Sequence, residues 1–566
     1  MYDLVIRGGL VVDGSGRPRA RADVGVSDGR IAAVGTIRER GREEIDAEGA
    51  VVTPGFIDGH THMDAQVFWD PYATSSSWHG ITTVVMGHCG FTLAPARPDA
   101  RELVVRNLER AEDMPAATLA AGIPWTWETF PEYLDSVDRL PKAVNYAANI
   151  GHSALRTWAM GERAFEQPAT AEDLDLMEVE VRRALRAGAV GFTTSRSAQH
   201  ETSDDRPVAS RLGSWDEVRR LVRAMGDAGG GMFQISPEAA GSSEDPEARR
   251  DWFDRLRQLT LDSGTVVTLP VSPTSAAGEQ LDWVDRVVGD GGRIFGLSHS
   301  RGISVLFSFE TRLPFERLPG WADLRSRPFD AQMRLLRDPD VRRRLVESAR
   351  TGHYGRAIGA EVRAPDYDAI RVWSSPVPPN RTVAMVARDR GVDPVEAMID
   401  LALESDFKQF FFQPLGCYED ADLVRVMKHP RMLMTFSDSG AHVSQLADSS
   451  IQTHLLAYWT RDRQEFTLEE AVRMLTLAPA EAWGFGDRGR VRPGFVADLN
   501  VFDPDTVGPD MPEVSYDLPA GAQRLTQTAH GFRATIVGGE VVLRDGKHTG
   551  ALPGQLLRGP FAPPVG

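Results

Sequence analysis

Residues 51–64 read VVTPGFIDGHTHMD, an apolar run that ends in two histidines separated by one residue. Residues i and i+2 of a β-strand point to the same side, so the imidazoles of His60 and His62 would face one spot. Two neutral imidazoles at that spacing can bind one metal ion. The stretch therefore predicts a buried strand with a metal site at its carboxyl end.

Short strand-like runs separated by glycine-containing turns lie at both ends of the chain, including turns at Asp28-Gly29 and Gly538-Gly539. The runs are Leu4–Arg7, Leu10–Asp13, Ala22–Val26 and Ile31–Val34 at one end, and Ala497–Phe502, Ala534–Val537 and Val541–Arg544 at the other. We therefore predict that residues 1–54 and 484–566 build one small β-sandwich domain, with a tail at the end of the chain.

Between these ends, residues 55–483 alternate apolar runs with longer helical stretches, which is typical of βα units around a parallel sheet. Eight runs are candidate strands: Val51–His62, Thr82–Cys89, Ala143–His152, Ala189–Arg196, Gly231–Ser236, Thr265–Pro270, Arg293–His299 and Arg431–Asp438. Eight is the strand number of a (β/α)8 barrel, whose site lies at the carboxyl ends of the strands. The predicted fold class is α/β: a TIM-like (β/α)8 barrel with the small β-sandwich domain formed from both termini.

Helices are expected between these strands. Residues Asp173–Ala187 carry apolar side chains about one helical turn apart, and Thr467 with Glu470 forms the pattern of a capping box before Leu468. Two long insertions interrupt the barrel pattern, at about 97–141 and 301–430. Insertions of that size after barrel strands usually form lids or substrate walls.

Composition narrows the function further. The chain has 566 residues, 63 basic and 80 acidic, for a net charge of −17. Such an acidic chain without a basic run is a poor binder of nucleic acid or anionic lipid. Its two cysteines, Cys89 and Cys417, exclude a disulfide framework and fit a reducing compartment. No signal-like start and no apolar run of about 18 residues is present, so we predict a soluble cytoplasmic protein without membrane or nucleic-acid partners.

Several stretches together resemble one family. They are IRGGLVVDGSG, PGFIDGHTHMDAQ, TTVVMGHCGF, GHSALR, FSDSGAHV, RGRVRPGFVADLNVFDP and VGGEVVLRDGKHTGALPGQLLR, and they cover nearly the whole length. The chain resembles the amidohydrolase superfamily and, within it, the N-acyl-D-amino-acid deacylase (D-aminoacylase-like) family. The resemblance implies metal ligands at His60, His62, Cys89 and Asp438, with Asp438 also as the catalytic proton shuttle.

The sequence departs from the family pattern at two strands. The family has a histidine at the end of strand five and another at strand six, whereas residues 232–236 read MFQIS and residues 266–271 read VVTLPV. Gln234 is a poor replacement because a neutral amide is a weak zinc ligand. Strand four ends in FTTSR without a lysine, so a lysine carbamate bridge is absent. We therefore expect one divalent ion, zinc, held by His60, His62 and Asp438 together with Cys89.

Other polar residues at predicted strand ends are candidates for substrate contact. His299 ends strand seven and His152 ends strand three, although a structural hydrogen-bonded role is the alternative for His152. Arg196 and Arg301 follow strands four and seven and could bind a substrate carboxylate through a planar guanidinium, as could Arg156. His88 should face the helices if Cys89 faces the barrel, because neighbouring strand residues point in opposite directions.

These observations predict a metal-dependent hydrolase of carbon–nitrogen bonds other than peptide bonds, acting on an N-acyl (D-)amino acid or a related small amide. Metal-activated water would attack the amide, and Asp438 would transfer the proton to the leaving nitrogen. Two alternatives remain open: a cyclic amide or lactone hydrolase, decarboxylase or lyase at the same metal site, and a degenerate barrel with a binding role. The expected partner is a small-molecule substrate, and a homo-oligomer is possible.

Overall fold

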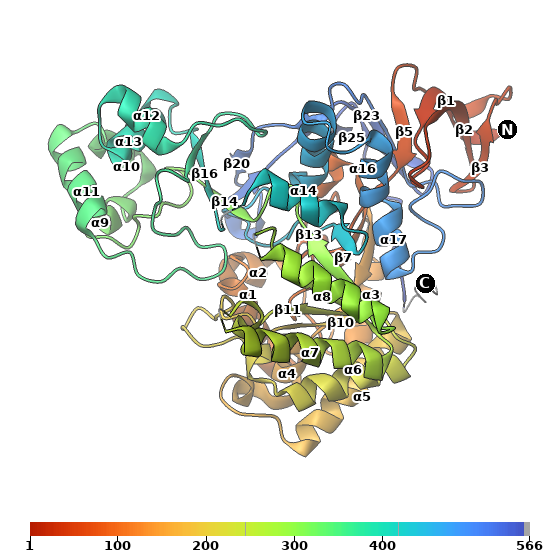
Figure 1. Cartoon of the computed structure of the whole chain (residues 1–566), viewed down its shortest axis with the longest axis horizontal. Coiled ribbons are helices and arrows are strands. Elements are labelled where there is room, and N and C mark those ends of the chain that lie inside the picture. Colours follow the sequence, from red (N-terminus) through yellow and green to blue (C-terminus); the bar gives the residue numbers. More distant parts are fainter. Residues whose placement is uncertain (244, 275, 417, 560–566) are drawn as a thin grey trace.

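The computed structural model describes residues 1–243, 245–274, 276–416 and 418–559. The second cysteine, Cys417, lies outside the described residues. None of the helices within the described ranges combines the length and apolar character that a membrane crossing requires. The strand-rich ends of the chain lie together at one side of the molecule, and a group of helices projects from the opposite side (Figure 1).

Both ends of the chain contribute strands to one nine-stranded sheet, in the order β25-β24-β23-β18-β5-β1-β2-β3, with β4 paired to β1. Its strands are β1 (Tyr2–Val11), β2 (Ala20–Ser27), β3 (Arg30–Gly35), β4 (Gly41–Asp46), β5 (Val51–Pro54), β18 (Leu499–Phe502), β23 (Phe532–Val537), β24 (Glu540–Arg544) and β25 (Lys547–His548). Apolar side chains of both ends share one buried cluster that includes Leu4, Val24, Leu499 and Ile536.

Two details of this sheet differ from the prediction. The runs Leu4–Arg7 and Leu10–Asp13 are one strand, β1, with an irregularity between Ile6 and Gly9. On one side β1 changes its partner there, from β4 to β5. The strands predicted for the sandwich are hydrogen-bonded in one continuous path, in which a bulge lets β1 continue with a new partner.

The middle of the chain supplies parallel strands in two groups. One sheet has the order β6-β7-β8 and the other the order β9-β10-β11-β12-β13-β17. Their bounds are β6 (Phe56–Asp58), β7 (Ile81–Met86), β8 (Asn145–Ala148), β9 (Ile150–Gly151), β10 (Gly191–Ser195), β11 (Met232–Ser236), β12 (Val266–Pro270), β13 (Arg293–Ser298) and β17 (Met432–Met434). The Thr435 hydroxyl donates to the carbonyl of Ile57, so the first and last of these strands are neighbours.

The stretch Val51–His62 was predicted as one strand, and this is wrong. Residues 51–54 form β5 of the terminal sheet, whereas residues 56–58 form β6 of the parallel sheet. The chain passes from one sheet to the other at Gly55, where a Cβ atom would lie 2.2 Å from the Thr82 hydroxyl oxygen. His60 and His62 therefore follow the strand rather than belong to it. The run Ala143–His152 is also divided, into β8 and β9 on either side of Asn149.

Helices follow most of the parallel strands: α4 (His152–Met160), α5 (Ala171–Ala187), α6 (Trp215–Asp227), α7 (Pro246–Ser263), α8 (Ala277–Gly289), α14 (Asp420–Lys428), α15 (Ile451–His454), α16 (Leu468–Leu475) and α17 (Leu477–Trp483). The predicted helix at 173–187 is confirmed as α5. The predicted capping box is confirmed as well, since the Thr467 hydroxyl accepts from the amide of Glu470 and the Glu470 carboxylate accepts from the amide of Thr467.

The first predicted insertion contains three helices, α1 (Arg101–Glu109), α2 (Ala116–Gly122) and α3 (Phe130–Asp138). Its aromatic side chains Trp127, Phe130 and Tyr133 are buried in the main apolar cluster. This insertion is therefore part of the body of the protein, and the turn after α1 lies against the carboxyl ends of the parallel strands through the contact of Glu112 with His442.

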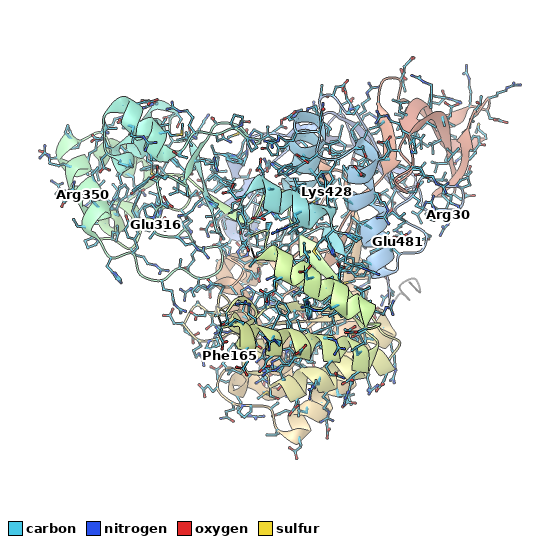
Figure 2. The ribbon with its side chains drawn as sticks, in the orientation of Figure 1. Arg30, Phe165, Glu316, Arg350, Lys428 and Glu481 are labelled. Atoms are coloured by element: carbon cyan, nitrogen blue, oxygen red, sulfur yellow. The ribbon has the colours of Figure 1, made fainter. Side chains whose placement is uncertain are left out.

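The second predicted insertion forms a lobe of its own, here termed the second-insertion lobe (residues 304–416). It contains the antiparallel sheet β14-β16-β15 and five helices. Their bounds are β14 (Ser304–Phe307), β15 (Arg371–Trp373), β16 (Phe410–Pro414), α9 (Trp321–Arg325), α10 (Phe329–Leu335), α11 (Pro339–Thr351), α12 (Val383–Arg390) and α13 (Pro394–Glu404). The lobe has a separate apolar cluster that includes Trp321 and Met398. Charged side chains cover it, with Arg350 at its outer end and Glu316 nearer to the body (Figure 2).

Candidate metal centre

His60 and His62 lie in the loop that follows β6, and both are fully buried. Backbone hydrogen bonds fix this loop on both sides, from the amide of Thr61 to the carbonyl of Val85 and from the amide of His62 to the carbonyl of Ser439. The loop is thus held between β7 and the segment that follows β17. The two rings lie edge to face with centroids 5.6 Å apart.

Cys89 reaches the same place from the segment that follows β7. The strand ends at Met86, and Gly87 and Cys89 both have left-handed φ angles, 83° and 54°. The Cys89 amide donates to Gln234 Oε1 at 2.7 Å, and its Sγ lies 3.6 Å from His60 Nε2. Gln234 is the strand-five residue at which the resemblance implies a histidine. Here it holds the backbone of the predicted thiolate ligand.

Asp438 lies four residues beyond β17 and also has a left-handed φ, 53°. Its Oδ1 is 3.1 Å from His60 Nε2 and 3.4 Å from His62 Nε2, yet within the described residues this oxygen has no hydrogen-bond partner. His62 Nε2 has none either in the same part of the chain. Buried polar atoms normally have a partner, so these orphaned atoms point to a ligand between them.

The spacing of the donor atoms fits a metal ion. Donors about 2.1 Å from one tetrahedral ion lie about 3.4 Å from one another. Three of the six separations among the donors of His60, His62, Cys89 and Asp438 are 3.1, 3.4 and 3.6 Å. One ligand atom each of His60, His62 and Cys89 lies within 4.8 Å of the other two. The residues present therefore fit a divalent ion with nitrogen, sulfur and oxygen ligands.

The electrostatics favour a cation at this place. Burial disfavours a charged imidazole, but the negative charges of Glu112, Asp438 and Cys89 raise the pKa of His62 well above its ordinary value. Burial would raise the pKa of the Cys89 thiol, but the neighbouring His60 and His62 rings lower it to about 7. Burial also opposes ionisation of Asp438, whose pKa the two imidazoles nonetheless hold well below its usual range. A bound metal ion would supply the positive charge that protons supply here.

Two residues at this centre were not predicted from the sequence. His88 was expected to face the helices, and this is wrong: its ring stacks on His60 with centroids 4.1 Å apart. Strand alternation does not apply there because β7 has already ended. Glu112, from the turn after α1, has its Oε2 3.6 Å from His62 Nε2 and 3.5 Å from His442 Nε2. No sequence motif marks Glu112, and only the fold brings it to the histidines.

His299 and Arg301 form a group beside the centre. His299 Nε2 lies 3.0 Å from Asp448 Oδ2, and the Arg301 guanidinium binds Asp448, Ser450 and the carbonyl of Ala447. Asp448 lines a small pocket together with Asp438. The two predicted substrate-contacting residues are thus linked to the pocket through one carboxylate, and their role in substrate binding stays a prediction.

His152 and Arg196 have structural partners elsewhere. His152 donates or accepts at both ring nitrogens, with Thr194 and Glu217 at 2.8 Å, and Glu217 also binds the buried Arg156. Arg196 binds Glu238 at 3.0 Å and the carbonyl of Gly213, and it lies over the ring of Trp215. The structure does not bring either residue into contact with the four predicted ligands, and their substrate role remains untested.

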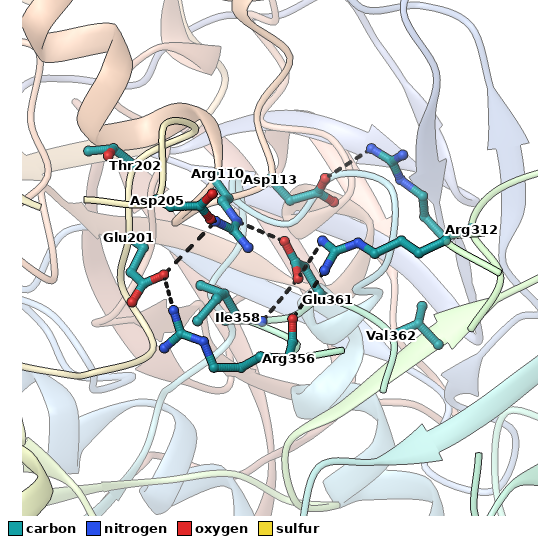
Figure 3. A network of polar contacts seen from close by, with 12 residues as sticks. Arg110, Asp113, Glu201, Thr202, Asp205, Arg312, Arg356, Ile358, Glu361 and Val362 are labelled. Carbon is teal, nitrogen blue, oxygen red and sulfur yellow. Dashed lines mark hydrogen bonds and ion pairs between the residues drawn. The ribbon is translucent and has the colours of Figure 1, made fainter. Parts of the chain in front are cut away.

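A network of ion pairs surrounds Arg110, which lies two residues before Glu112 in the sequence (Figure 3). Arg110 of the first insertion binds Asp205 and Glu361, and Arg356 binds Glu201. The network therefore joins the first insertion, the loop after β10 and the second-insertion lobe. A cleft of about 370 Å³ lies among these segments and is lined by Arg110, Asp113, Arg312, Glu361 and Gln445, among others.

Comparisons with known proteins agree with this geometry. The model of a family described as the amidohydrolase family matches residues 43–543. A D-aminoacylase of Alcaligenes xylosoxydans xylosoxydans is 27% identical over 98% of this chain and 97% of its own length. An N-acyl-D-glutamate deacylase of the same organism is 28% identical over 98% of this chain and 96% of its own length.

A solved structure shares the fold over the full length. It is an N-acyl-D-glutamate deacylase of Bordetella bronchiseptica in complex with zinc and a phosphonate inhibitor that mimics the tetrahedral intermediate. It covers 99% of this chain and 100% of its own, with a TM-score of 0.64 and 25% identity. The described strands and helices of this chain are therefore arranged as in that enzyme.

Proposed function

Because the chain belongs to the amidohydrolase family, and is a hydrolase of carbon–nitrogen bonds other than peptide bonds, we propose that it cleaves the amide of an N-acyl-D-amino acid. The products are the carboxylate of the acyl group and the free amino acid. The names of the relatives support this substrate class, since they are deacylases of N-acyl-D-glutamate and related compounds that match nearly the whole chain.

One observation carries the proposal: the buried donors of His60, His62 and Cys89 converge, and the Asp438 carboxylate adjoins both rings. We propose that they hold one zinc ion. A bound zinc ion supplies Lewis acidity, which polarises the scissile carbonyl and lowers the pKa of water. The Cys89 thiol, with a pKa of about 7 before metal binds, loses its proton with little cost at neutral pH.

Asp438 is suited to move the proton in this reaction. Its side chain is 17% exposed, whereas those of His60 and His62 are at most 1% exposed, so it reaches the neighbouring pocket while they do not. Its low pKa keeps it ionised at neutral pH and able to accept a proton from the attacking water. The same carboxyl group can then donate this proton to the leaving nitrogen.

The pocket beside Asp438 has polar walls and a volume of about 30 Å³, room for about one water molecule. It is lined by Gln66, Ser439, Asp448, Ser449 and Arg524, among others. Arg524 lines the pocket and is held by Asp517 and Asp70, and Arg301 binds Asp448, which also lines the pocket. Among the arginines predicted from the sequence, Arg301 is therefore the one we propose for orienting the substrate carboxylate.

A panel of substrates tests the proposal. The purified, zinc-loaded enzyme is assayed with N-acetyl-D- and N-acetyl-L-forms of glutamate, aspartate, leucine and methionine, and with cyclic amides. We expect hydrolysis of at least one N-acetyl-D-amino acid and a preference for it over its L-enantiomer. Hydrolysis of cyclic amides alone, by enzyme that contains its metal, would contradict the proposed substrate class.

A further inference from the structure

Glu112 is a buried carboxylate whose ion-pair partners, among the described residues, are two histidines at 3.5 and 3.6 Å. Its side chain is 1% exposed, and its Oε1 has no hydrogen-bond partner within the described residues. Its Oε2 faces two imidazoles, at 3.6 Å from His62 Nε2 and 3.5 Å from His442 Nε2. A buried carboxylate is costly as an anion unless a cation lies beside it, so this position would suit a bound cation.

Several acids near Glu112 have arginine, hydroxyl or amide partners instead of histidines. Arg110, two residues earlier, binds Asp205 and Glu361 rather than Glu112, and Arg356 binds Glu201 (Figure 3). Asp113, the next residue, accepts hydrogen bonds from Ser444 and Gln445. Among the described residues, the ion pairs of Glu112 involve histidines only.

The distance between Glu112 and His62 indicates what the cation is. At 3.6 Å the two atoms are too far apart for a good hydrogen bond between nitrogen and oxygen. The same separation is close to the value of about 3.4 Å expected for two donors around one tetrahedral ion. His62 Nε2 also has no hydrogen-bond partner in the described part of the chain, so this nitrogen is free to face an ion.

The residues at the two missing imidazole positions leave room for such a ligand. Gln234 donates no ligand because its Oε1 accepts the amide of Cys89. Thr268 of β12 is buried, and among the described residues its hydroxyl has no partner. A carboxylate that enters from the first insertion can supply the negative charge and the oxygen donor that these strands do not.

We propose that Glu112 is a ligand of the metal centre, on the side of His62, and that His442 positions its carboxylate. The carbonyl of Glu112 accepts the amide of His442, which fixes the two residues to each other, and the His442 ring lies against Oε2. Outer-shell contacts of this kind orient a ligand carboxylate. The inference rests on the proposed metal centre and is independent of which amide is the substrate.

Metal binding by the purified full-length chain tests this directly. Wild type, Glu112→Gln and the control Glu109→Gln are stripped of metal, and their affinity for Zn²⁺ is measured by competition with a chromogenic chelator. Glu109 is half-buried at the end of α1, and within the described ranges it forms no ion pair with a histidine. We expect Glu112→Gln to weaken zinc binding by about 10–100-fold or more, and Glu109→Gln to leave it unchanged.

Thermal unfolding with and without zinc is a second test of the role of Glu112. Zinc should raise the Tm of wild type more than that of Glu112→Gln, because wild type binds zinc more tightly. Equal zinc affinity and equal stabilisation by zinc in wild type and Glu112→Gln would overturn the inference. If wild type itself binds no zinc, the proposed metal centre is wrong. That result differs from equal zinc binding by wild type and Glu112→Gln, which would contradict only the role of Glu112.

Discussion

Asp438 is the residue on which the proposed chemistry depends most. Its replacement by asparagine keeps the shape and removes the group that accepts and donates the proton. Asp438→Asn should lower kcat by about 10²–10⁴-fold, the usual contribution of a general acid–base group. Steady-state kinetics on the best substrate of the panel measure this, with the metal content of each preparation determined in parallel. A variant that retains wild-type kcat with a full metal content would show that Asp438 does not transfer the proton.

Glu217 is predicted to control stability rather than catalysis. It is 2% exposed and binds both His152 and Arg156, and Arg156 is itself fully buried. Burial would raise the pKa of Glu217, but His152 and Arg156 lower it from 4.5 to about 2. Because the folded pKa is depressed, the stabilisation is fully present above about pH 4.5 and is lost as the pH falls towards 2.

Substitution of Glu217 tests this account. Glu217→Gln leaves the buried Arg156 without its carboxylate and should reduce the free energy of unfolding at pH 7 by about 3–5 kcal/mol. The matched control is Glu178→Gln, whose partly exposed pairs with Arg182 and Arg220 should contribute about 1 kcal/mol or less. Denaturant unfolding at pH 7 and pH 3 compares the two. Equal losses of unfolding free energy in Glu217→Gln and Glu178→Gln would contradict the prediction that the buried Glu217 stabilises the fold more than a partly exposed pair does.

Much of the candidate centre could be predicted from the residues themselves. The pattern His-x-His after an apolar run identifies His60 and His62, and the family resemblance adds Cys89 and Asp438. Glu112 could not be found in this way, because it lies in an insertion without a motif and only the turn after α1 places it at His62. His88 was misplaced because the alternation of a strand was extended beyond Met86, where β7 ends.

At the scale of elements, the loop after β17 shapes the metal centre as much as the strand does. Gly440 has a φ of 94°, and a Cβ atom there would lie 2.6 Å from the carbonyl oxygen of His62. The Gly440→Ala substitution combines a strained backbone with a clash against the loop that carries two predicted ligands. We expect a loss of at least about 1 kcal/mol of stability and weaker zinc binding.

Gly486→Ala is the control for this substitution, because nothing lies within 4 Å of a Cβ atom at Gly486 and its φ is not left-handed. It should leave zinc affinity and Tm within experimental error. If Gly440→Ala binds zinc as tightly as Gly486→Ala, the geometry of this loop does not control the metal centre. Chelator competition and thermal unfolding give both quantities on the same preparations.

The elements themselves were largely predictable. The periodicity of α5 and the capping box of α16 depend on local residues, and both are present in the structure. The division of Val51–His62 between two sheets was not predictable from hydrophobicity, since both halves are buried and apolar. It depends on Pro54-Gly55, where the chain leaves the terminal sheet and joins the parallel one.

At the scale of the whole molecule, the second-insertion lobe meets the body at the ion pairs of Figure 3. Arg110 is 16% exposed and contacts Glu361 of the lobe and Asp205 of the loop after β10. Arg110→Gln should loosen these segments and increase hydrogen exchange at residues 199–206 and 353–364, while global stability changes by about 1 kcal/mol or less because the pairs are partly exposed.

The control for this prediction is Arg350→Gln at the outer end of the lobe, where Arg350 is 68% exposed and pairs with Glu347. Mass spectrometry of hydrogen exchange should show no change in residues 199–206 for this variant. If Arg110→Gln also leaves both segments unchanged, the network does not hold the lobe against the body. An accompanying change in KM would indicate that the lobe contributes to substrate binding.

The central claim is that His60 and His62, with Cys89 and Asp438, hold a divalent metal ion. Elemental analysis of the purified protein, before and after reloading with Zn²⁺, Mn²⁺ or Fe²⁺, measures this most directly, with the double variant His60→Ala/His62→Ala as the comparison. The account predicts about one tightly bound ion per wild-type chain and a loss of that ion in the double variant. Less than about 0.2 ion per wild-type chain after reloading, or equal metal content in both proteins, would contradict it.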